Sequence, residues 1–325
     1  MSIGSVGDSV PGADGNGAST DATDPDLTLV AVAAHGLAGS RIRPPSGPLD
    51  QSAWRQLTRS CSDEHLVGLL AATVDSGVLR IADDQAADLA AMTAGARARS
   101  AAVCESVVQV SRTLDAEGIV HLVLNGPVIA IRAYADPAVR DLGAADVLVD
   151  ASQVPTPSPQ DATVRFRNDL LPADLGQPVG LAEARQHPTL VHVDGHPIPA
   201  LPAEAQLVYA CAQATPAPGA ERLLALRDVA QLALSDDLDP ASVARFVGPG
   251  RAMAVVAGAV RLAWQRFDLA DKTRLSVWAA RYDAVPVSGR LPRPRADGAR
   301  PGRRVGTVAQ RITAVLAAPV RKVGG

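Results

Sequence analysis

The chain has 325 residues, of which 47% are hydrophobic and 20% are charged, and its formal net charge is −3. This composition is typical of a globular protein with a substantial core, and the small negative charge provides no overall attraction to nucleic acid. Only 3% of the residues are aromatic, which argues against a protein that stacks nucleic-acid bases on aromatic side chains. At this length we expect two modest domains or one elaborated domain.

The N-terminal segment is poor in apolar residues. Residues 1–27 contain five Asp and no Lys or Arg, and they are predicted to form a disordered acidic lead. The segment lacks the basic start and the hydrophobic middle of a signal peptide. No apolar window of the chain is long enough for a membrane span. A cytoplasmic location is therefore expected. Cys61, Cys104 and Cys211 lie far apart without a CxxC pairing, which favours reduced thiols.

Residues 28–118 are predicted to form an N-terminal helical region. A short apolar element opens it, two helical stretches follow with Asp50 and Ser62 as their N-caps, and a long helix ends at Gly118. The expected ranges are Leu27–Leu37, Leu49–Leu79 and Asp84–Glu117, the last with Val103, Val107, Val110 and Leu114 at helical spacing.

The most informative segment follows at residues 119–150. An apolar strand, Ile119–Leu124, runs into Gly126, a short helix comes next, and a second strand, Ala145–Val149, carries Asp146. Within this segment the chain reads LNG, then RAYADP, then VRDLGAADVLV.

These three motifs resemble the uncharacterised nucleotidyltransferase family of the polymerase-β-like superfamily, whose members read roughly LLKG, RxYPDP and LRPMGDLDLLV. The resemblance extends over most of residues 28–282. It implies an α+β fold, in which a small mixed β-sheet forms a nucleotidyltransferase-like core between N-terminal helices and a C-terminal helical region. It also implies transfer of a nucleotidyl group from a nucleoside triphosphate to a hydroxyl group with the help of Mg²⁺.

The resemblance also indicates how much of that chemistry this chain retains. The family holds metal with two aspartates one residue apart on a strand, and here those positions are Ala144 and Asp146. Asn125 replaces the lysine of LLKG, and the later strand that carries a third carboxylate aligns with Val164–Arg167, where Arg165 takes the acidic position. A cation there opposes metal binding.

Asp146 is therefore the candidate catalytic and metal-binding residue, with a relic carboxylate as the alternative. Asp150 lies on the same strand face but on the order of 13 Å away, which is too far to share a metal ion. Asp141 and Asp161 lie in predicted loops, so either could fold back as a replacement carboxylate.

Four residues are candidates for nucleotide binding. Asn125 and Gly126 stand where a strand gives way to a helix, although Pro127 removes one amide donor and a purely structural turn is the alternative. Arg132 and Arg140 match the two arginines around the family's YxDP motif. They could contact phosphates, or they could pair with Asp136 and Asp141 on the surface.

Two histidine features have simpler explanations. His192, Asp194 and His196 would share a strand face and could bind metal if the strand stayed straight, but the Asp194–Gly195 pair favours a turn. His121, in the first apolar strand, is expected to be a packed or hydrogen-bonded residue rather than a general base.

The C-terminal half begins with a predicted hairpin over Thr189–Ile198. Helices are then expected from Pro202 and over Glu221–Leu232, Pro240–Phe246 and Gly250–Tyr282, with Asp228 at an acidic position of a family helix of the type RWLxDLxxL. The predicted regions are a core over 119–200, a C-terminal helical region over 201–284 and a basic tail over 285–325. Residues 290–325 contain nine Lys or Arg against one Asp, which suits either a solvated tail or an anionic partner such as a membrane or nucleic acid.

Three functions remain open from the sequence. The first is a catalytically degenerate member of the nucleotidyltransferase family with a nucleotide-binding, scaffolding or regulatory role. The second is an active Mg²⁺-dependent nucleotidyltransferase, and the third is a non-enzymatic module that binds an unknown protein partner. The sequence does not specify the acceptor, the base preference, the pathway or the oligomeric state.

Overall fold

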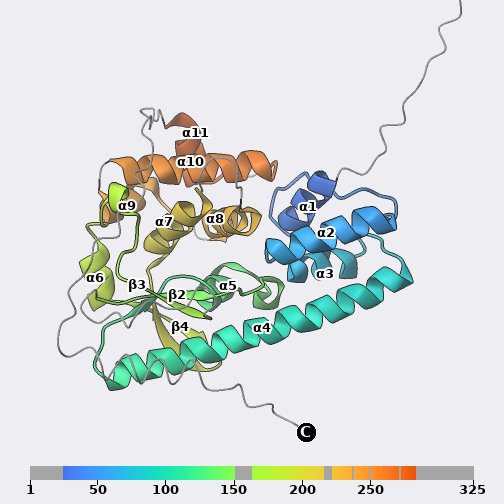
Figure 1. Ribbon diagram of the computed structural model, residues 1–325. Helices are drawn as coiled ribbons and strands as arrows, with labels where there is room; N and C mark the ends of the chain where they lie inside the picture. Colours follow the sequence, from blue (N-terminus) through green and yellow to red (C-terminus); the bar gives the residue numbers. More distant parts are fainter. Residues whose placement is uncertain are drawn as a thin grey trace, which may run out of the picture.

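The computed structural model describes residues 25–150, 163–215, 222–235, 238–248, 250–270 and 272–282. These residues form a small mixed sheet with helices before and after it in the chain, which confirms the predicted α+β class (Figure 1). The predicted acidic lead falls almost entirely outside the described residues. The basic tail, Asp161 and the Pro- and Ser-rich segment 152–160 lie outside them as well.

The sheet has five strands in the order β3-β2-β1-β5-β4. The strands are β1 Leu122–Val123, β2 Ala145–Leu148, β3 Val164–Arg167, β4 Thr189–Val193 and β5 His196–Ala200. β1 pairs antiparallel with β2 and parallel with β5, while β2 pairs parallel with β3. β1 is shorter than the predicted strand Ile119–Leu124, because the His121 ring bonds to the Ile119 carbonyl instead of leaving it for a neighbouring strand.

The predicted hairpin is present as β4 and β5, which pair antiparallel. Asp194 and Gly195 form its turn with φ angles of 48° and 79°. Positive φ at both central residues is the geometry that an Asp-Gly pair favours in a two-residue hairpin.

The N-terminal helices are α1 Pro25–Ala34, α2 Gln51–Asp63, α3 Val67–Asp75 and α4 Asp83–Ala116. Asp50 caps α2 as predicted, since its carboxylate accepts hydrogen bonds from the amides of Ser52 and Ala53. The prediction that Ser62 caps the next helix is wrong. Ser62 lies inside α2, and the chain changes direction at His65, which has a φ of 56°.

One face of the sheet is covered by the C-terminal half of α4. Its predicted apolar stripe of Val103, Val107, Val110 and Leu114 is buried together with the β-strand residues that point the same way. α4 continues past the sheet to α1, α2 and α3, which form a cluster at the other end of the molecule (Figure 1). One helix thus joins the N-terminal helices to the core.

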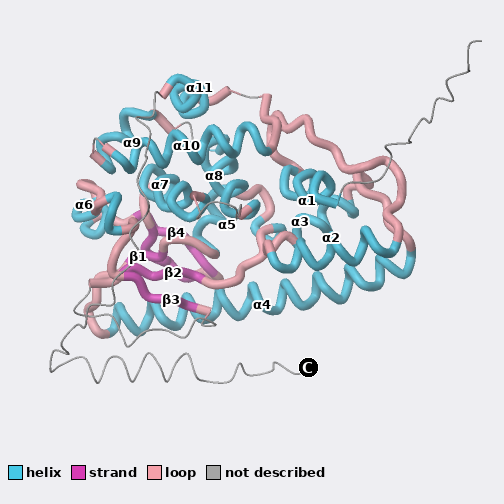
Figure 2. Tube along the Cα trace, turned by 45° about the horizontal axis from the view of Figure 1, so that its top comes forward, coloured by secondary structure: helices cyan, strands magenta, loops and turns pink. Residues whose placement is uncertain are grey.

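The C-terminal helices cover the opposite face (Figure 2). α5 Pro127–Ala133 lies between β1 and β2 in the chain, and α6 Leu181–Gln186 precedes β4. The later helices are α7 Ala203–Ala214, α8 Leu223–Ser235, α9 Pro240–Val247, α10 Arg251–Arg266 and α11 Arg274–Arg281. Two short 3₁₀ turns, η1 Pro137–Val139 and η3 Ala173–Leu175, complete the described elements.

The predicted single helix over Gly250–Tyr282 is wrong, because the chain breaks between α10 and α11. The Ser40 hydroxyl donates to the Phe267 carbonyl at 2.8 Å, and Ser40 forms a β-bridge with Leu269. These contacts with a loop 227 residues earlier take the backbone out of the helix. α11 then starts at a new cap, where the Thr273 hydroxyl accepts from the Ser276 amide.

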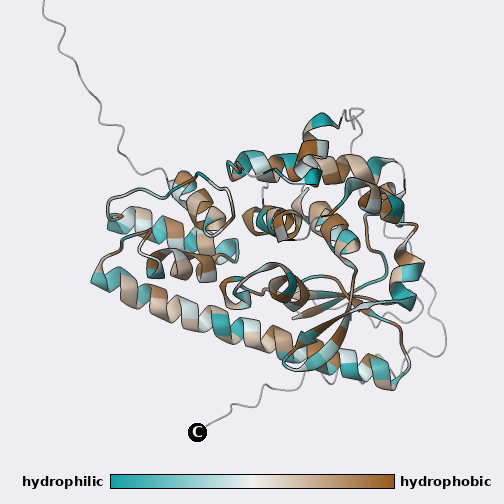
Figure 3. Cartoon of the chain, turned by 180° about the vertical axis from the view of Figure 1, so that it is seen from behind, coloured by the Kyte–Doolittle hydropathy of each residue, from teal (hydrophilic) through white to brown (hydrophobic). Residues whose placement is uncertain are grey.

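The strands divide their side chains between two apolar clusters. Leu122, Leu124 and Leu148 belong to the larger cluster with the helices α7, α8 and α10, whereas Val123 and Val147 belong to the cluster beneath α4. Figure 3 shows hydrophobic segments in the strands and in the helices that pack on them. Within the described residues, no helix is both long and apolar enough to cross a membrane.

Candidate functional site

Asp146 is a fully buried carboxylate in the middle of the sheet. It lies on β2 between Ala145 and Val147, whose side chains enter the cluster under α4. Because side chains alternate along a strand, Asp146 points to the other face, toward α7. Its exposed fraction is 0%, so its charge depends entirely on protein partners.

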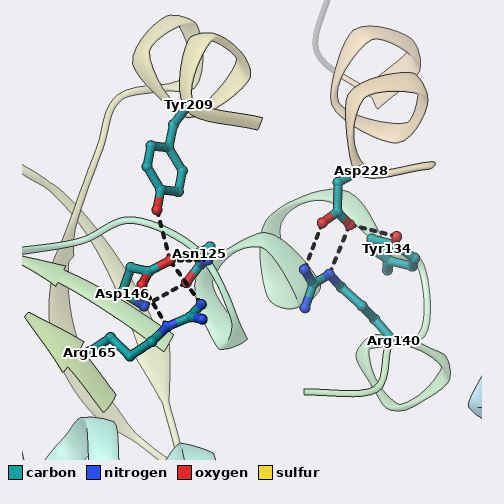
Figure 4. A network of polar contacts seen from close by, with 7 residues as sticks. All are labelled: Asn125, Tyr134, Arg140, Asp146, Arg165, Tyr209 and Asp228. Carbon is teal, nitrogen blue, oxygen red and sulfur yellow. Dashed lines mark hydrogen bonds and ion pairs between the residues drawn. The ribbon is translucent and has the colours of Figure 1, made fainter. Parts of the chain in front are cut away.

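Both carboxylate oxygens of Asp146 are occupied by protein donors (Figure 4). Oδ2 accepts from Asn125 Nδ2 at 2.7 Å and from the Tyr209 hydroxyl at 2.7 Å. Oδ1 accepts from Arg165 Nε at 3.0 Å and from Arg167 Nε at 3.3 Å. An ionised carboxylate offers about four lone-pair positions, so these four donors use them all.

The register of β2 and β3 brings Arg165 and Arg167 close to Asp146. Asp146 pairs with Arg165 in the parallel ladder, so the two side chains start from neighbouring positions. Arg167, two residues further along β3, returns to the same face. Arg165 also donates from Nη2 to Asp146 Oδ2 at 3.3 Å, which makes its contact side-on and bidentate. Arg165, which was aligned with an acidic position of the family, therefore lies beside Asp146 in the structure.

The pKa values of the neighbours reflect this arrangement. Burial raises the pKa of the Tyr209 hydroxyl, and the Asp146 charge raises it further, so Tyr209 stays protonated and donates. Burial is the largest single effect and lowers the pKa of Arg167, but the charge of Asp146, the neighbouring Tyr209 and the hydrogen bonds to both together outweigh it, and the net shift is upward.

Asn125 links the end of β1 to β2. Besides donating to the Asp146 carboxylate, its Oδ1 accepts from the Asp146 amide at 2.7 Å. The position that carries lysine in the family motif thus carries a neutral side chain that holds Asp146 in place. This observed role is structural, and a contact between Asn125 and nucleotide stays a prediction.

The residues around Asp146 do not fit a Mg²⁺ site. Ala144 has no ligand atom, Arg165 brings a positive charge, and every lone pair of Asp146 is already used. Hard divalent cations need several oxygen ligands. Within the described part of the chain, no group of three or more His, Cys, Asp or Glu could hold a metal ion.

The other acids considered near Asp146 are the distant Asp150 and the replacement candidate Asp141, and both are engaged elsewhere. Asp150 is exposed and pairs with Arg185 at 2.5 Å. Asp141 is buried, and its carboxylate accepts from the Gly68 amide at 3.0 and 3.2 Å. Neither Asp141 nor Asp150 forms a shared ligand set with Asp146 among the described residues.

Gly126 is required by the turn itself. Its φ is 67° and its ψ is −123°, a conformation that side chains with a Cβ rarely adopt. An added Cβ would lie 3.1 Å from the Ala145 Cβ and 3.3 Å from the Ala144 oxygen. Gly126 therefore allows α5 to start directly against β2, and its contact with phosphate stays a prediction.

Arg132, in the RAYADP segment, and Arg140, just after it, have partners other than the surface carboxylates considered from the sequence. Arg132 donates to the Leu201 carbonyl and to Gln206 Oε1, both at 2.9 Å. Arg140 is buried and holds Asp228 through Nε at 2.8 Å and Nη2 at 2.6 Å. Pairing of these arginines with Asp136 and Asp141 was therefore the wrong alternative.

Asp228 has a second partner in Tyr134, whose hydroxyl donates to Oδ1 at 2.7 Å (Figure 4). Burial is the largest single effect and lowers the pKa of Arg140, but the charge and hydrogen bonds of Asp228 together with Tyr134 outweigh it and raise the pKa. Asp146 and Asp228 are thus held in the same way, each by a side-on arginine and a tyrosine hydroxyl. Asp136 instead caps the 3₁₀ turn η1 by accepting from the Ala138 amide.

A pocket of about 530 Å³ lies against these two ion pairs. Arg165 and Tyr209 line it beside Asp146, and Arg140 and Asp228 line it further along. The other walls come from the end of α2, the loop before β2, and helices α7 and α8. This volume lies within the range of small-molecule sites, about 300–1,000 Å³.

Titratable groups of the pocket wall have shifted pKa values. Burial lowers the pKa of His65, and the nearby charges of Arg140, Arg99, Arg165 and Arg222 lower it further. Burial raises the pKa of Glu64 and of Asp141, in each case against hydrogen bonds from backbone amides that lower it. His65 is therefore favoured as a neutral imidazole in an arginine-rich wall.

The remaining histidines do not build a second site. Val193 pairs with His196 across the hairpin, which places His192 on the opposite face, and the predicted turn explains the motif. His121 is buried, with Nε2 2.6 Å from the Ser111 hydroxyl and Nδ1 3.1 Å from the Ile119 carbonyl. It is the packed, hydrogen-bonded residue that was expected.

Sequence reasoning missed Tyr209, Arg167 and His65 as neighbours of the site. Tyr209 is one of only three tyrosines in the chain and lies between the apolar residues Val208 and Ala210 of α7, which is a weak signal for a buried hydroxyl. Arg167 could have been found from Arg165, because two residues along a strand return to the same face.

The comparison with protein families supports the predicted resemblance. Residues 50–158 match the model of a family described as uncharacterised nucleotidyltransferase, which is about a third of the chain. The match covers the helices α2 to α5 and the strands β1 and β2, including Asp146. Neither the curated proteins nor the solved structures gave a match.

Proposed function

We propose that this protein is a catalytically degenerate nucleotidyltransferase that binds a nucleotide in the pocket beside Asp146 without transferring it. One observation carries the proposal: Asp146 is saturated by Asn125, Tyr209, Arg165 and Arg167. Nucleotidyl transfer with two metal ions needs carboxylates that can bridge those ions. In this chain the only carboxylate retained from the family's pair is used in an ion pair.

The pocket supports the binding half of the proposal. It lies where the nucleotidyltransferase-like motifs meet, between the start of β2 and the helices α7 and α8. Its wall combines apolar contacts from Ile129 and Leu224 with charged groups, a mixture that suits a nucleotide with a flat aromatic base and an anionic end. Asn125 lines the pocket, whereas Gly126 and Arg132 support its frame.

A protein that binds a nucleotide without converting it is suited to a regulatory role. We propose a cytoplasmic protein that reports the presence of a nucleotide to a protein partner. We also propose that the chain is divided into an N-terminal helical region over 28–118, a nucleotidyltransferase-like core over 119–200 and a C-terminal helical region over 201–284.

A thermal-shift screen tests binding. The four ribonucleoside triphosphates are added at millimolar concentration, with Mg²⁺ and with EDTA, and release of pyrophosphate is followed in parallel. We expect at least one nucleotide to raise the melting temperature, since a ligand of the folded state stabilises it, and no pyrophosphate to appear. Absence of any shift would refute nucleotide binding, and Mg²⁺-dependent pyrophosphate release that Asp146→Asn abolishes would establish the active alternative.

A further inference from the structure

The carboxylates that line the pocket are largely occupied by protein donors. Asp228 is held by Arg140 and Tyr134. Glu64 Oε2 accepts from the Leu223 amide at 3.0 Å, and the Asp141 oxygens accept from the Gly68 amide. Apart from Asp63, which is exposed and also lines the pocket, the acidic side chains of the wall therefore have local partners before any ligand enters.

Two arginines have donors to spare. Arg165 uses Nε and Nη2 to hold Asp146, and among the described residues its Nη1 makes no hydrogen bond. Its side chain is 41% exposed and lines the pocket. Arg222 also lines the pocket and is exposed. Within the described part of the chain its side chain makes no hydrogen bond, although its charge lowers the pKa of Glu64.

Asp146 makes Arg165 a preorganised donor. The bidentate contact fixes the plane of the guanidinium group, so little side-chain entropy remains to be lost when a ligand binds. A guanidinium group is also the side chain best matched to two oxygens of a phosphate group. Figure 4 shows this guanidinium beside Asp146 and Asn125, and shows the Arg140–Asp228 pair as a separate group in the same view.

We infer that Arg165, together with Arg222, binds a phosphate group of the ligand directly, in the role that a divalent cation has in metal-dependent relatives. This inference rests on the proposed function, because it names how the same pocket would recognise a nucleotide. The ligand class is a nucleoside polyphosphate whose terminal phosphates are free of metal. The cation that blocks a metal site at Asp146 is then also the group that replaces the metal.

Mg²⁺ should weaken this binding. A divalent cation chelates the phosphate oxygens of a triphosphate and neutralises part of their charge. The Arg165 and Arg222 donors would then compete with the metal for the same oxygens. We expect excess Mg²⁺ to reduce the affinity, by on the order of tenfold if both arginines contact phosphate.

Isothermal titration calorimetry tests the inference with ATP and inorganic tripolyphosphate as probes. Each probe is titrated into the full chain, once in EDTA and once in excess Mg²⁺. The variants are Arg165→Ala and Arg222→Ala, and Arg222→Ala leaves the Asp146 network intact. Arg41→Ala is the matched control, because Arg41 is an exposed arginine that pairs with Asp268 away from the pocket.

The expected result is binding of both probes in EDTA, weaker binding in Mg²⁺, and loss of at least tenfold in affinity in each pocket variant, with Arg41→Ala unchanged. Binding that requires Mg²⁺ would overturn the inference and leave nucleotide binding in place. Unchanged affinity in Arg222→Ala and Arg165→Ala would overturn it as well. Absence of binding in both buffers would overturn the inference and the proposed function together.

Discussion

Arg165 and Asp146 are register partners in the parallel pair β2–β3, and Arg165 Nε donates to Asp146 Oδ1 at 3.0 Å. Arg140 and Asp228 repeat the arrangement with Nε and Nη2 donors at 2.8 and 2.6 Å. Each aspartate also accepts from a tyrosine hydroxyl. Two carboxylates beside one pocket are thus held by protein cations, and both ion pairs should contribute to stability.

Asp146→Asn should lower the free energy of unfolding by about 2 kcal/mol, because it leaves Arg165 and Arg167 without their counter-charge. The loss stays below that of a fully buried pair because both arginine side chains are more than 40% exposed. Chemical denaturation measures the difference. Asp150→Asn is the control, since its pair with Arg185 is solvent-exposed and should change stability by at most about 0.5 kcal/mol. Equal losses in the two variants would contradict a structural role for the Asp146 network.

Asp228→Asn should be more damaging than Asp146→Asn. The side chain of Arg140 is only 8% exposed, so removal of its partner leaves a cation that water cannot reach. Such a change typically costs about 3–5 kcal/mol. The same denaturation series gives the ranking, and a smaller loss for Asp228→Asn than for Asp146→Asn would show that burial does not control these pairs.

The sequence predicted the frame of this site better than its contacts. The strand with Asp146, the glycine before α5 and the strand with Arg165 were predictable, because strand alternation and the family motifs are local signals. The partners Tyr209 and Asp228 were not, because they lie 63 and 88 residues from Asp146 and Arg140, the side chains that they hold. Contacts of that length depend on how helices α7 and α8 pack on the sheet, and no local spacing reports them.

The errors in helix boundaries have the same origin. Ser62 is a good N-cap residue by type, but α2 continues past it to Asp63. α10 ends where the Phe267 carbonyl accepts a hydrogen bond from the hydroxyl of Ser40, which lies in a loop far away in the sequence. In both cases a tertiary contact or backbone turn outweighed a local preference.

Gly126→Ala should destabilise the protein by about 1–3 kcal/mol, because the residue has a φ of 67° and an added Cβ would press on Ala145. Gly258→Ala is the matched comparison. It lies within α10, where an added Cβ would meet nothing within 4 Å, and alanine should stabilise the helix by about 0.5–1 kcal/mol. Thermal melting of the two variants should therefore shift in opposite directions. A neutral Gly126→Ala would show that the turn before α5 is not constrained.

His121 should make the protein less stable in mild acid. Burial lowers the pKa of His121 below its ordinary value of 6.5 in the folded state, against small opposing effects of Ile119 and Asp115. The unfolded chain therefore binds the proton more tightly, so the stabilisation is complete above pH 6.5 and is lost as the pH falls toward the folded-state pKa.

His121→Gln isolates this effect from His35 and His65, whose pKa values are also lowered by burial. The free energy of unfolding is measured for both proteins between pH 5 and pH 8. The difference in free energy of unfolding between wild type and variant should become smaller as the pH falls below 6.5. A difference that stays constant or grows in acid would contradict a buried neutral imidazole.

Restoring the acids should restore a response to metal. In Ala144→Asp combined with Arg165→Asp, two carboxylates would join Asp146 at the pocket wall, and one blocking cation would be gone. We expect Mn²⁺ to raise the melting temperature of this variant and to leave the wild type unchanged, since only the variant offers several oxygen ligands. A Mn²⁺ response of equal size in the wild type would show that Arg165 does not block a metal site.

We propose that Asp146 is a partner of Arg165 and Arg167 and not a ligand of catalytic metal. Pyrophosphate release from each nucleoside triphosphate with Mg²⁺ or Mn²⁺, compared between the wild type and Asp146→Asn, tests this role. We expect both proteins to release pyrophosphate only at the level of the protein-free blank. Metal-dependent release by the wild type that disappears in Asp146→Asn would show that Asp146 is a catalytic metal ligand.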